Sequence, residues 1–283
     1  NRSSDLRFLK NHNLYDYLVD LCNDYNFNPS KSSGIVTLAL MRNLSIVTKR
    51  FKSLEVTAIT TAGVRVNAVC AGDEASYYEE NGEFKAGTIN TILLINSKLD
   101  DNVLAEAFMV ASEAKSVALN TLKIPSQFSN NFATGTGTDG LIVASDLDSD
   151  NLITNAGKHS KLGELIAKSI IESIHVAIKK QVCITRYSQS NVLVRLNRYK
   201  LDINEFYDSL NQDKHSFISG LKIDSRKSEN VAITSSILNL FDEVQQGLLD
   251  RNVALKLSNS ILSGCDSYYV AELLKYWIDY FLK

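Results

Sequence analysis

A short run of alternating glycine and threonine is the part of this 283-residue chain with the clearest capacity for chemistry. Residues 133–140 read ATGTGTDG, which presents three threonine hydroxyls, several backbone N–H groups and the carboxylate of Asp139. Because glycine adopts positive φ at little cost, such a turn can cradle an anion or a developing oxyanion. The alternative interpretation is a glycine-rich turn in which Asp139 bonds its own backbone. The local sequence leaves both open.

A second segment with catalytic potential, AGKHSKLGE at residues 156–164, leads into a predicted helix. Ser160 is the expected N-cap, which places His159 just outside the first turn. The positive end of the helix dipole and two neighbouring lysines disfavour a charged imidazole there. We therefore expect a neutral His159 that could act as a general base or bind a metal. A surface histidine at the start of a helix is the alternative.

One further carboxylate and several glycine-containing turns complete the candidate site. Glu113 lies on a predicted helix, away from its apolar stripe, where a solvated helix face is the alternative interpretation. Turns that pair glycine with small polar residues at predicted strand edges occur at residues 63–73 and 87–90. If these turns converge at one edge of a sheet, Glu113, Asp139 and His159 would supply acid–base chemistry or a hard-metal site. The chain contains no G-x-S-x-G, H-E-x-x-H or Walker A motif.

The elements that must position these residues are strands in the middle of the chain and helices around them. Strands are predicted at 54–62, 64–70, 89–95 and 141–144, where β-branched and apolar residues dominate. Helices are predicted at 5–25, from Asp100 or Asp101 to about Leu122, and at 161–181. This mixture predicts an α/β or α+β fold in which helices flank a mixed β-sheet.

Apolar spacing indicates which faces of the two long helices are buried. On the helix at 161–181, an apolar residue stands at every fourth position, beginning with Leu162. On the helix from Asp100, the expected stripe is Leu104, Phe108, Ala111, Ala118 and Leu122.

The last third of the chain is predicted to be entirely helical. Apolar periodicity recurs at 237–249, 253–262 and 269–281. We therefore predict an α/β domain at residues 1–200 and a helical C-terminal extension at 201–283. The aromatic residues of this extension could form the surface of a homodimer or pack back on the core, and the sequence does not decide between the two.

Composition excludes several classes of protein. Hydrophobic residues make up 45% of the chain and charged residues 22%, which is typical of a folded core rather than of a disordered chain. A net charge of −2 argues against nucleic-acid binding. Four widely spaced cysteines without a C-x-x-C pair argue against a zinc site or a disulfide framework. No apolar run reaches the ~18 residues of a membrane span, and we expect a cytoplasmic protein.

Glycine is unevenly distributed. Nine of the 13 glycines fall between Gly63 and Gly163. Since glycine is the default residue for backbone that other residues adopt with strain, we expect unusual backbone geometry in the middle third of the chain, including a polar, acidic loop at 72–87.

These segments, in this order, resemble the adenosylcobinamide amidohydrolase family of corrinoid salvage. The resemblance rests chiefly on ATGTGTDGLIVA at 133–144 and AGKHSKLGELI at 156–166. It is supported by TAGVRVNAVCAGD, GTINTILLIN and SEAKSVAL, and it covers about residues 54–200. Two departures stand out: Ser112 replaces the usual threonine, and Glu74 occupies a place where the family often has proline.

The resemblance implies a hydrolase that cleaves the amide between a propionyl arm of the corrin ring and aminopropanol. Adenosylcobinamide, the implied partner, would give adenosylcobyric acid for cobalamin biosynthesis. No cofactor is implied, and assistance by a metal stays open. A non-catalytic corrinoid- or nucleotide-binding module is the main alternative, and a hydrolase with a different substrate is another.

For this reaction, the requirements of amide hydrolysis lead to a hypothesis for the roles of individual residues. His159 would act as base and acid, and Thr138 with the backbone N–H groups of residues 135–140 would hold the oxyanion. Glu113 and Asp139 would orient His159 or the attacking water. Contacts with the substrate are assigned to a larger polar set: Asn67, Asp73, Thr88, Asn90, Lys115, Thr134, Thr136, Lys158 and Ser160.

Overall fold

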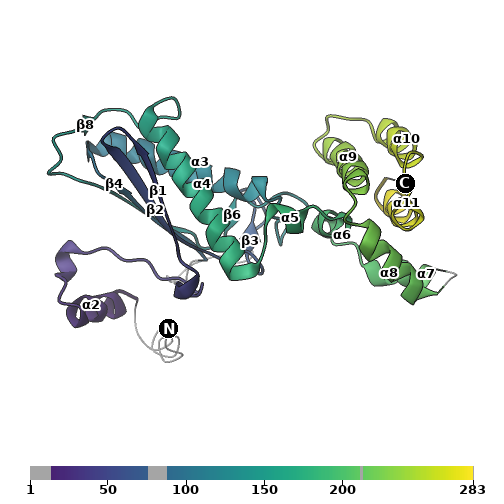
Figure 1. Ribbon diagram of the computed structural model, residues 1–283, viewed down its shortest axis with the longest axis horizontal. Coiled ribbons are helices and arrows are strands. Elements are labelled where there is room, and N and C mark those ends of the chain that lie inside the picture. The colour runs from purple at the N-terminus through teal and green to yellow at the C-terminus, as the bar shows by residue number, and fades with distance from the viewer. Residues whose placement is uncertain (1–13, 76–87, 211–212, 283) are drawn as a thin grey trace. The chain divides into compact units, whose positions relative to one another are not determined.

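The computed structural model describes residues 14–75, 88–210 and 213–282 (Figure 1). The chain forms two compact units, Asn1–Thr185 and Arg186–Lys283. The predicted domain boundary, between residues 200 and 201, stays a prediction. No helix among the described residues combines the length and the hydropathy needed to cross a membrane.

The first unit is built on a four-stranded mixed sheet in the order β1-β2-β4-β7 (Figure 1). Its strands are β1 (Ser45–Phe51), β2 (Leu54–Ala62), β4 (Ile89–Ile95) and β7 (Gly140–Ser145). β2 runs antiparallel to both of its neighbours, β1 and β4, whereas β7 runs parallel to β4. The predicted mixed sheet flanked by helices is thus confirmed.

Two long helices, α3 (Asp101–Thr121) and α4 (Lys161–Val182), pack on one face of this sheet. Alternate residues of β2, beginning with Leu54 and Val56, are buried against them. Because side chains alternate between the two faces of a strand, this face carries the core.

The α4 helix follows its sequence closely. Ser160 caps it by accepting a hydrogen bond from the Gly163 backbone N–H at 2.9 Å, as predicted. The predicted apolar stripe is buried over its whole length: Leu162, Ile166, Ile170, Ile174 and Ile178.

On α3 the predicted stripe is only partly correct. Ala111, Ala118 and Leu122 are buried, but Phe108 is 49% exposed. The buried face is centred instead on small residues such as Ala107 and Ala114. These allow the helix to approach the sheet and α4 closely, which turns the phenyl ring to one side.

The predicted strand at 64–70 is wrong for most of its length. Only Ala68–Val69 (β3) is extended, and it pairs with Gly135–Thr136 (β6). Val66 is 82% exposed, so the apolar side chains of this segment do not share one buried face. The strand β1 was not predicted, because its second half carries Lys49 and Arg50.

The remaining elements of the first unit are short. A second small pair joins β5 and β8 in parallel. The part of the predicted N-terminal helix that the structure describes is α2, and residues 5–13 lie outside the described residues. Bounds are as follows: α2 (Leu14–Asp24), η1 (Pro29–Lys31), η2 (Met41–Asn43), β5 (Lys98–Leu99) and β8 (Leu152–Ile153).

The second unit is helical and has its own hydrophobic core, which bears out the predicted helical C-terminal region. Trp277 is fully buried there, with the ring of Tyr199 5.2 Å away. Tyr268 and Tyr280 are exposed; the homodimer stays a prediction. Its elements are α5 (Arg186–Gln189), α6 (Val192–Leu196), η3 (Asn197–Tyr199), α7 (Ile203–Ser209), α8 (Lys214–Asp224), α9 (Ser228–Gln245), α10 (Arg251–Leu262) and α11 (Tyr268–Leu282).

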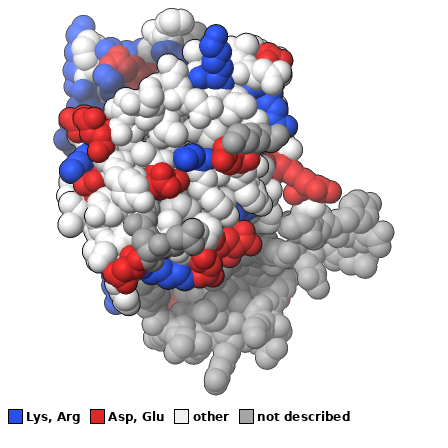
Figure 2. All heavy atoms as spheres, turned by 90° about the vertical axis from the view of Figure 1, so that its right-hand side faces the viewer, with Lys and Arg blue, Asp and Glu red and all other residues white. Residues whose placement is uncertain are grey.

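Charged side chains are mixed on the surface. On the face shown in Figure 2, acidic and basic residues lie interspersed among broad uncharged areas of the described residues. This distribution accords with the near-neutral net charge of −2.

Candidate active site

The glycine-rich turn is held in place by its backbone. Thr136 pairs with Ala68 across the short β3–β6 ladder. Beyond it, the Gly137 N–H donates to the Asn67 carbonyl at 3.1 Å, and the Thr88 N–H donates to the Thr138 carbonyl at 3.2 Å. Three segments far apart in the sequence therefore meet at this turn, as expected for a site built from the glycine-containing turns.

Asp139 is the most heavily bonded side chain of the turn. Its carboxylate accepts hydrogen bonds from the Thr136 N–H at 3.1 Å and the Thr136 hydroxyl at 2.5 Å. It also forms an ion pair with the Lys115 ammonium on α3, at 2.5 Å. The two side chains are only 15% and 22% exposed. Asp139 thus accepts hydrogen bonds within its own turn. In addition, it contacts the Lys115 cation in a partly buried ion pair.

Two glycines of the turn allow other side chains to approach the backbone closely; they do not provide unusual backbone angles. Among the described glycines only Gly72 and Gly247 have positive φ, so the glycines within residues 133–140 do not adopt the positive φ that is open to them. A Cβ on Gly135 would lie 2.3 Å from Asp139 Oδ2, and one on Gly140 would lie 2.7 Å from Asn90 Oδ1. A Cβ on Gly137 would meet nothing within 4 Å. Gly135 and Gly140 are therefore required by the side chains packed against them.

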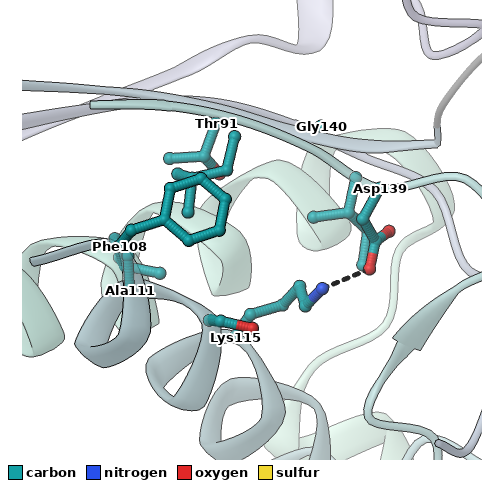
Figure 3. Close-up of a pocket in the computed structure, with 10 residues that line it drawn as sticks. Thr91, Phe108, Ala111, Lys115, Asp139 and Gly140 are labelled. Carbon is teal, nitrogen blue, oxygen red and sulfur yellow. Dashed lines mark hydrogen bonds and ion pairs between the residues drawn. The ribbon is translucent and has the colours of Figure 1, made fainter. Parts of the chain in front are cut away.

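The ion pair opens into a cavity of about 190 Å³ between the sheet and the two helices (Figure 3). Lys115 and Asp139 supply its charged groups, and Thr91 and Ser112 supply hydroxyls. The rest of the wall is largely apolar: Ile89, Phe108, Ala111, Gly140, Leu141 and Ile170. The cavity can therefore hold a short chain that is apolar along its length and polar at particular atoms.

A second polar group lies at the start of α4. The Lys158 ammonium contacts the Glu113 carboxylate at 2.8 Å, with both side chains at least half exposed. His159 beside them is exposed. Gly163 allows this loop to pack tightly on the helix, since a Cβ there would lie 2.2 Å from the Gly157 carbonyl oxygen.

The two polar groups are separated by α3. Successive residues of an α-helix are rotated by about 100°, so Glu113 and Lys115 project from nearly opposite sides. Lys115 reaches Asp139, whereas Glu113 reaches Lys158. Among the described residues, no hydrogen bond or ion pair joins His159 to Glu113 or Asp139. The structure therefore does not bring the three predicted acid–base residues together.

Three of the predicted substrate contacts lie around the turn. The Asn67 amide donates to the Thr88 hydroxyl at 2.6 Å, and the Asn90 amide donates to the Val36 carbonyl at 2.6 Å. The Oδ1 atoms of Asn67 and Asn90 are buried and have no hydrogen-bond partner within the described part of the chain. Asn90 is paired with Gly140 across the parallel strands, which explains the close contact at that glycine.

Two others tie loops together. The Thr134 hydroxyl accepts from the Ala71 N–H at 2.8 Å. The Asp73 carboxylate accepts from the Cys70 N–H at 2.8 Å and from the Ser126 hydroxyl at 2.5 Å. Burial raises the pKa of Asp73, but the hydrogen bonds it accepts outweigh burial and hold that pKa below its ordinary value. Both side chains have a visible structural task.

Sequence reasoning did not identify Thr91, Phe108 and Ser112 as lining a site. The sequence predicts that Phe108 lies in the helix core, but the ring is half-exposed and lines the cavity. Thr91 did carry a signal, since it is a polar residue on the otherwise apolar helix-facing side of β4. Among the residues described, we find no group of three or more histidine, cysteine or acidic side chains that could hold a metal ion. Chelation experiments test whether the activity depends on a metal.

Comparison with known proteins identifies the family of the first unit. The family model described as adenosylcobinamide amidohydrolase matches residues 1–186. An uncharacterised protein of Methanocaldococcus jannaschii is 35% identical over 187 residues, covering 61% of this chain and 72% of that protein. An adenosylcobinamide amidohydrolase of Methanosarcina mazei is 31% identical over 156 residues, covering 52% and 66%.

The comparison with solved structures found no match to the chain. The family model, by contrast, covers the glycine-rich turn, the ion pair, the cavity and the whole of α4. The chain belongs to the adenosylcobinamide amidohydrolase family.

Proposed function

We propose that the protein hydrolyses the amide that joins a propionyl arm of adenosylcobinamide to aminopropanol. Adenosylcobinamide and water would give adenosylcobyric acid and 1-amino-2-propanol, a reaction of corrinoid salvage. Family membership supplies the reaction class. The observation that carries the assignment to a site is the Lys115–Asp139 ion pair inside the cavity below the glycine-rich turn.

The size of the cavity supports a single-arm binding mode. Pockets that enclose a whole drug-sized ligand typically measure about 300–1,000 Å³, whereas this cavity measures about 190 Å³. The macrocycle would therefore stay outside, with one arm inserted. The half-exposed ring of Phe108 offers apolar surface at the wall.

Amide hydrolysis needs a base for water, positive charge or donors for the oxyanion, and a proton for the leaving amine. In the proposed mechanism Asp139 takes a proton from water while the water oxygen bonds to the amide carbon. The Lys115 ammonium stabilises the resulting oxyanion. Asp139 then returns the proton to the amine nitrogen as the C–N bond breaks.

The backbone of the turn has less to offer the oxyanion than its sequence suggests. The Thr136 N–H already donates to Asp139, and the Gly137 N–H donates to Asn67. Lys115 is therefore the stronger candidate. Thr136, through its N–H and hydroxyl, holds the Asp139 carboxylate in position.

A second arrangement places catalysis at the start of α4, with His159 as base and Glu113 and Lys158 beside it. Because these residues lie on the other side of α3 from Lys115, the two arrangements would not share one transition state within a chain. They predict opposite outcomes for single substitutions.

The test is to incubate purified protein with adenosylcobinamide, separate the products by chromatography, and compare variants. Asp139→Asn and Lys115→Met are each expected to lower kcat by about 100-fold or more, and His159→Ala by less than about threefold. Thermal unfolding of each variant checks folding.

Three outcomes contradict parts of this proposal. Full loss in His159→Ala with turnover kept in Asp139→Asn would move the chemistry to α4. Activity lost on exhaustive chelation and restored by a metal would add a cofactor. Tight binding of adenosylcobinamide without release of aminopropanol would favour the corrinoid-binding module.

A further inference from the structure

Three buried hydroxyls form a chain that ends at the cavity. The Thr91 and Thr60 hydroxyl oxygens lie 3.1 Å apart, and those of Thr60 and Ser173 lie 2.8 Å apart. The Ser173 hydroxyl in turn lies 3.0 Å from the backbone carbonyl oxygen of Ile170. Thr60 and Ser173 are fully buried, and Thr91 is the member that lines the cavity.

The carbonyl at the far end fixes the direction of every bond in this chain. A carbonyl oxygen only accepts, so Ser173 must use its single proton to donate to Ile170. The Ser173 oxygen then accepts from Thr60. Thr60 has therefore used its own proton and can only accept from Thr91.

Thr91 is consequently left with lone pairs and no proton for the cavity. We infer that Thr91 acts as a fixed hydrogen-bond acceptor in this cavity and selects an arm that carries a donor, the hydroxyl of an amino alcohol. The inference deepens the proposed function, on which it rests, by assigning a specificity-determining residue for the amine half of the amide.

The position of Thr91 relative to the ion pair suits this task. Thr91 is paired with Leu141 across the parallel strands. Leu141 stands two residues after Asp139 in the chain. Strands rise about 3.3 Å per residue, so Thr91 lies roughly 7 Å along the sheet from the level of Asp139. Figure 3 shows Thr91 beside Phe108, with Asp139 and Lys115 forming the charged part of the cavity. An arm whose amide lies at the ion pair would carry its hydroxyl, two carbons beyond the amide nitrogen, toward Thr91.

The test measures the binding of small amides that reproduce the arm, so that it does not require turnover of adenosylcobinamide. The probes are N-(2-hydroxypropyl)propanamide, which can donate, and N-(2-oxopropyl)propanamide, which has a carbonyl acceptor in the same place. Titration followed by NMR gives Kd for each. The wild-type protein is expected to prefer the hydroxyl probe by about threefold to tenfold, the worth of one hydrogen bond. Thr91→Val, which keeps the side-chain shape, is expected to abolish that preference.

Two further variants separate proton direction from packing. In Ser173→Ala or Thr60→Val the hydroxyl chain is cut, so Thr91 can turn its own proton toward the cavity. Both variants are expected to bind the oxo probe more tightly and so to reduce the preference for the hydroxyl probe. Ser173→Ala makes the smaller change in side-chain volume. Thr57→Val is the matched control, because it removes a cross-strand Thr48–Thr57 hydroxyl pair of 2.8 Å that does not line the cavity.

The outcomes distinguish this inference from the proposed function. Equal binding of the two probes by the wild type, binding of neither, or an unchanged preference in Thr91→Val would overturn the acceptor role, whatever the protein does to adenosylcobinamide. A hydroxyl preference that depends on Thr91, in a protein that fails to release aminopropanol, would uphold it while the hydrolysis proposal fails. If both hold, Thr91→Val is expected to raise KM for adenosylcobinamide about threefold to tenfold.

Discussion

At the scale of single residues, the glycines of the TGTGTDG turn differ in what they do. Gly135 leaves room for the Asp139 carboxylate, which would lie 2.3 Å from a Cβ at that position. Gly137, two residues away, faces open space. The two positions are indistinguishable in the sequence pattern, and only Gly135 is required by the ion pair.

This difference predicts the effect of alanine at each glycine. Gly135→Ala is expected to push Asp139 away from Lys115 and to lower kcat by about 100-fold, since a shift of about 1 Å in a catalytic group costs about that much. The fold should survive, because the displaced atoms belong to the end of a side chain. Gly137→Ala is the matched control and should retain wild-type kinetics. Wild-type kcat in Gly135→Ala would show that the Asp139–Lys115 geometry is not needed for turnover.

At the scale of elements, strands and helices form the cavity wall, and loops hold the glycine-rich turn in place beside it. The segment around Asp73 is tied to the loop at Ser126 by the Asp73 carboxylate and to the glycine-rich turn by the bond between Ala71 and Thr134. These bonds hold the short β3–β6 ladder between two irregular segments. Asp73, predicted to contact substrate, has this structural task in the part of the chain described.

The lowered pKa of Asp73 gives this tie a pH dependence. A carboxyl whose pKa is lower in the folded state stabilises the fold fully above its unfolded pKa, about 3.9, and loses that contribution as the pH falls through the folded value. Asp73→Asn is expected to reduce the free energy of unfolding by about 1–2 kcal/mol at pH 7. The difference from the wild type should shrink below about pH 4.

Urea unfolding at a series of pH values measures this effect. Asp148→Asn, in an exposed position after β7, serves as the control and should follow the wild type throughout. A difference for Asp73→Asn that is constant between pH 7 and pH 3 would contradict the charge-dependent tie.

At the scale of the whole molecule, the chain consists of two units with separate hydrophobic cores. The family model ends at residue 186 and the first unit ends at Thr185. Every residue of the cavity belongs to the first unit. In the second unit, Trp277 and its aromatic neighbours pack on one another.

We predict that each unit folds when expressed alone, because each buries its own apolar surface. Residues 1–185 should retain kcat for adenosylcobinamide within about threefold of the full chain, as the cavity is complete within them. Residues 186–283 should give a helical circular dichroism spectrum and a cooperative thermal transition. A non-cooperative transition in either fragment would show that the two units depend on each other for folding.

The sequence alone determined several of the local elements and the family. Strands β2 and β4 and helix α4 follow directly from β-branched runs, an N-cap serine and apolar residues at every fourth position, because these patterns act through neighbouring residues on backbone angles and on one buried face. The residues of a few segments and the order of those segments were sufficient to identify the family, which the family model confirms.

Only the tertiary structure decided which polar side chains meet. Lys115 reaches Asp139 and Glu113 reaches Lys158 because α3 packs at one particular rotation on the sheet. A rotation of that helix by two residues, about 200°, would place Lys115 where Glu113 lies. The packing of α4 on the sheet likewise brings Ser173 to Thr60 and so fixes the proton of Thr91. Such contacts depend on how a helix and a sheet fit together over many side chains, and no local pattern encodes that fit.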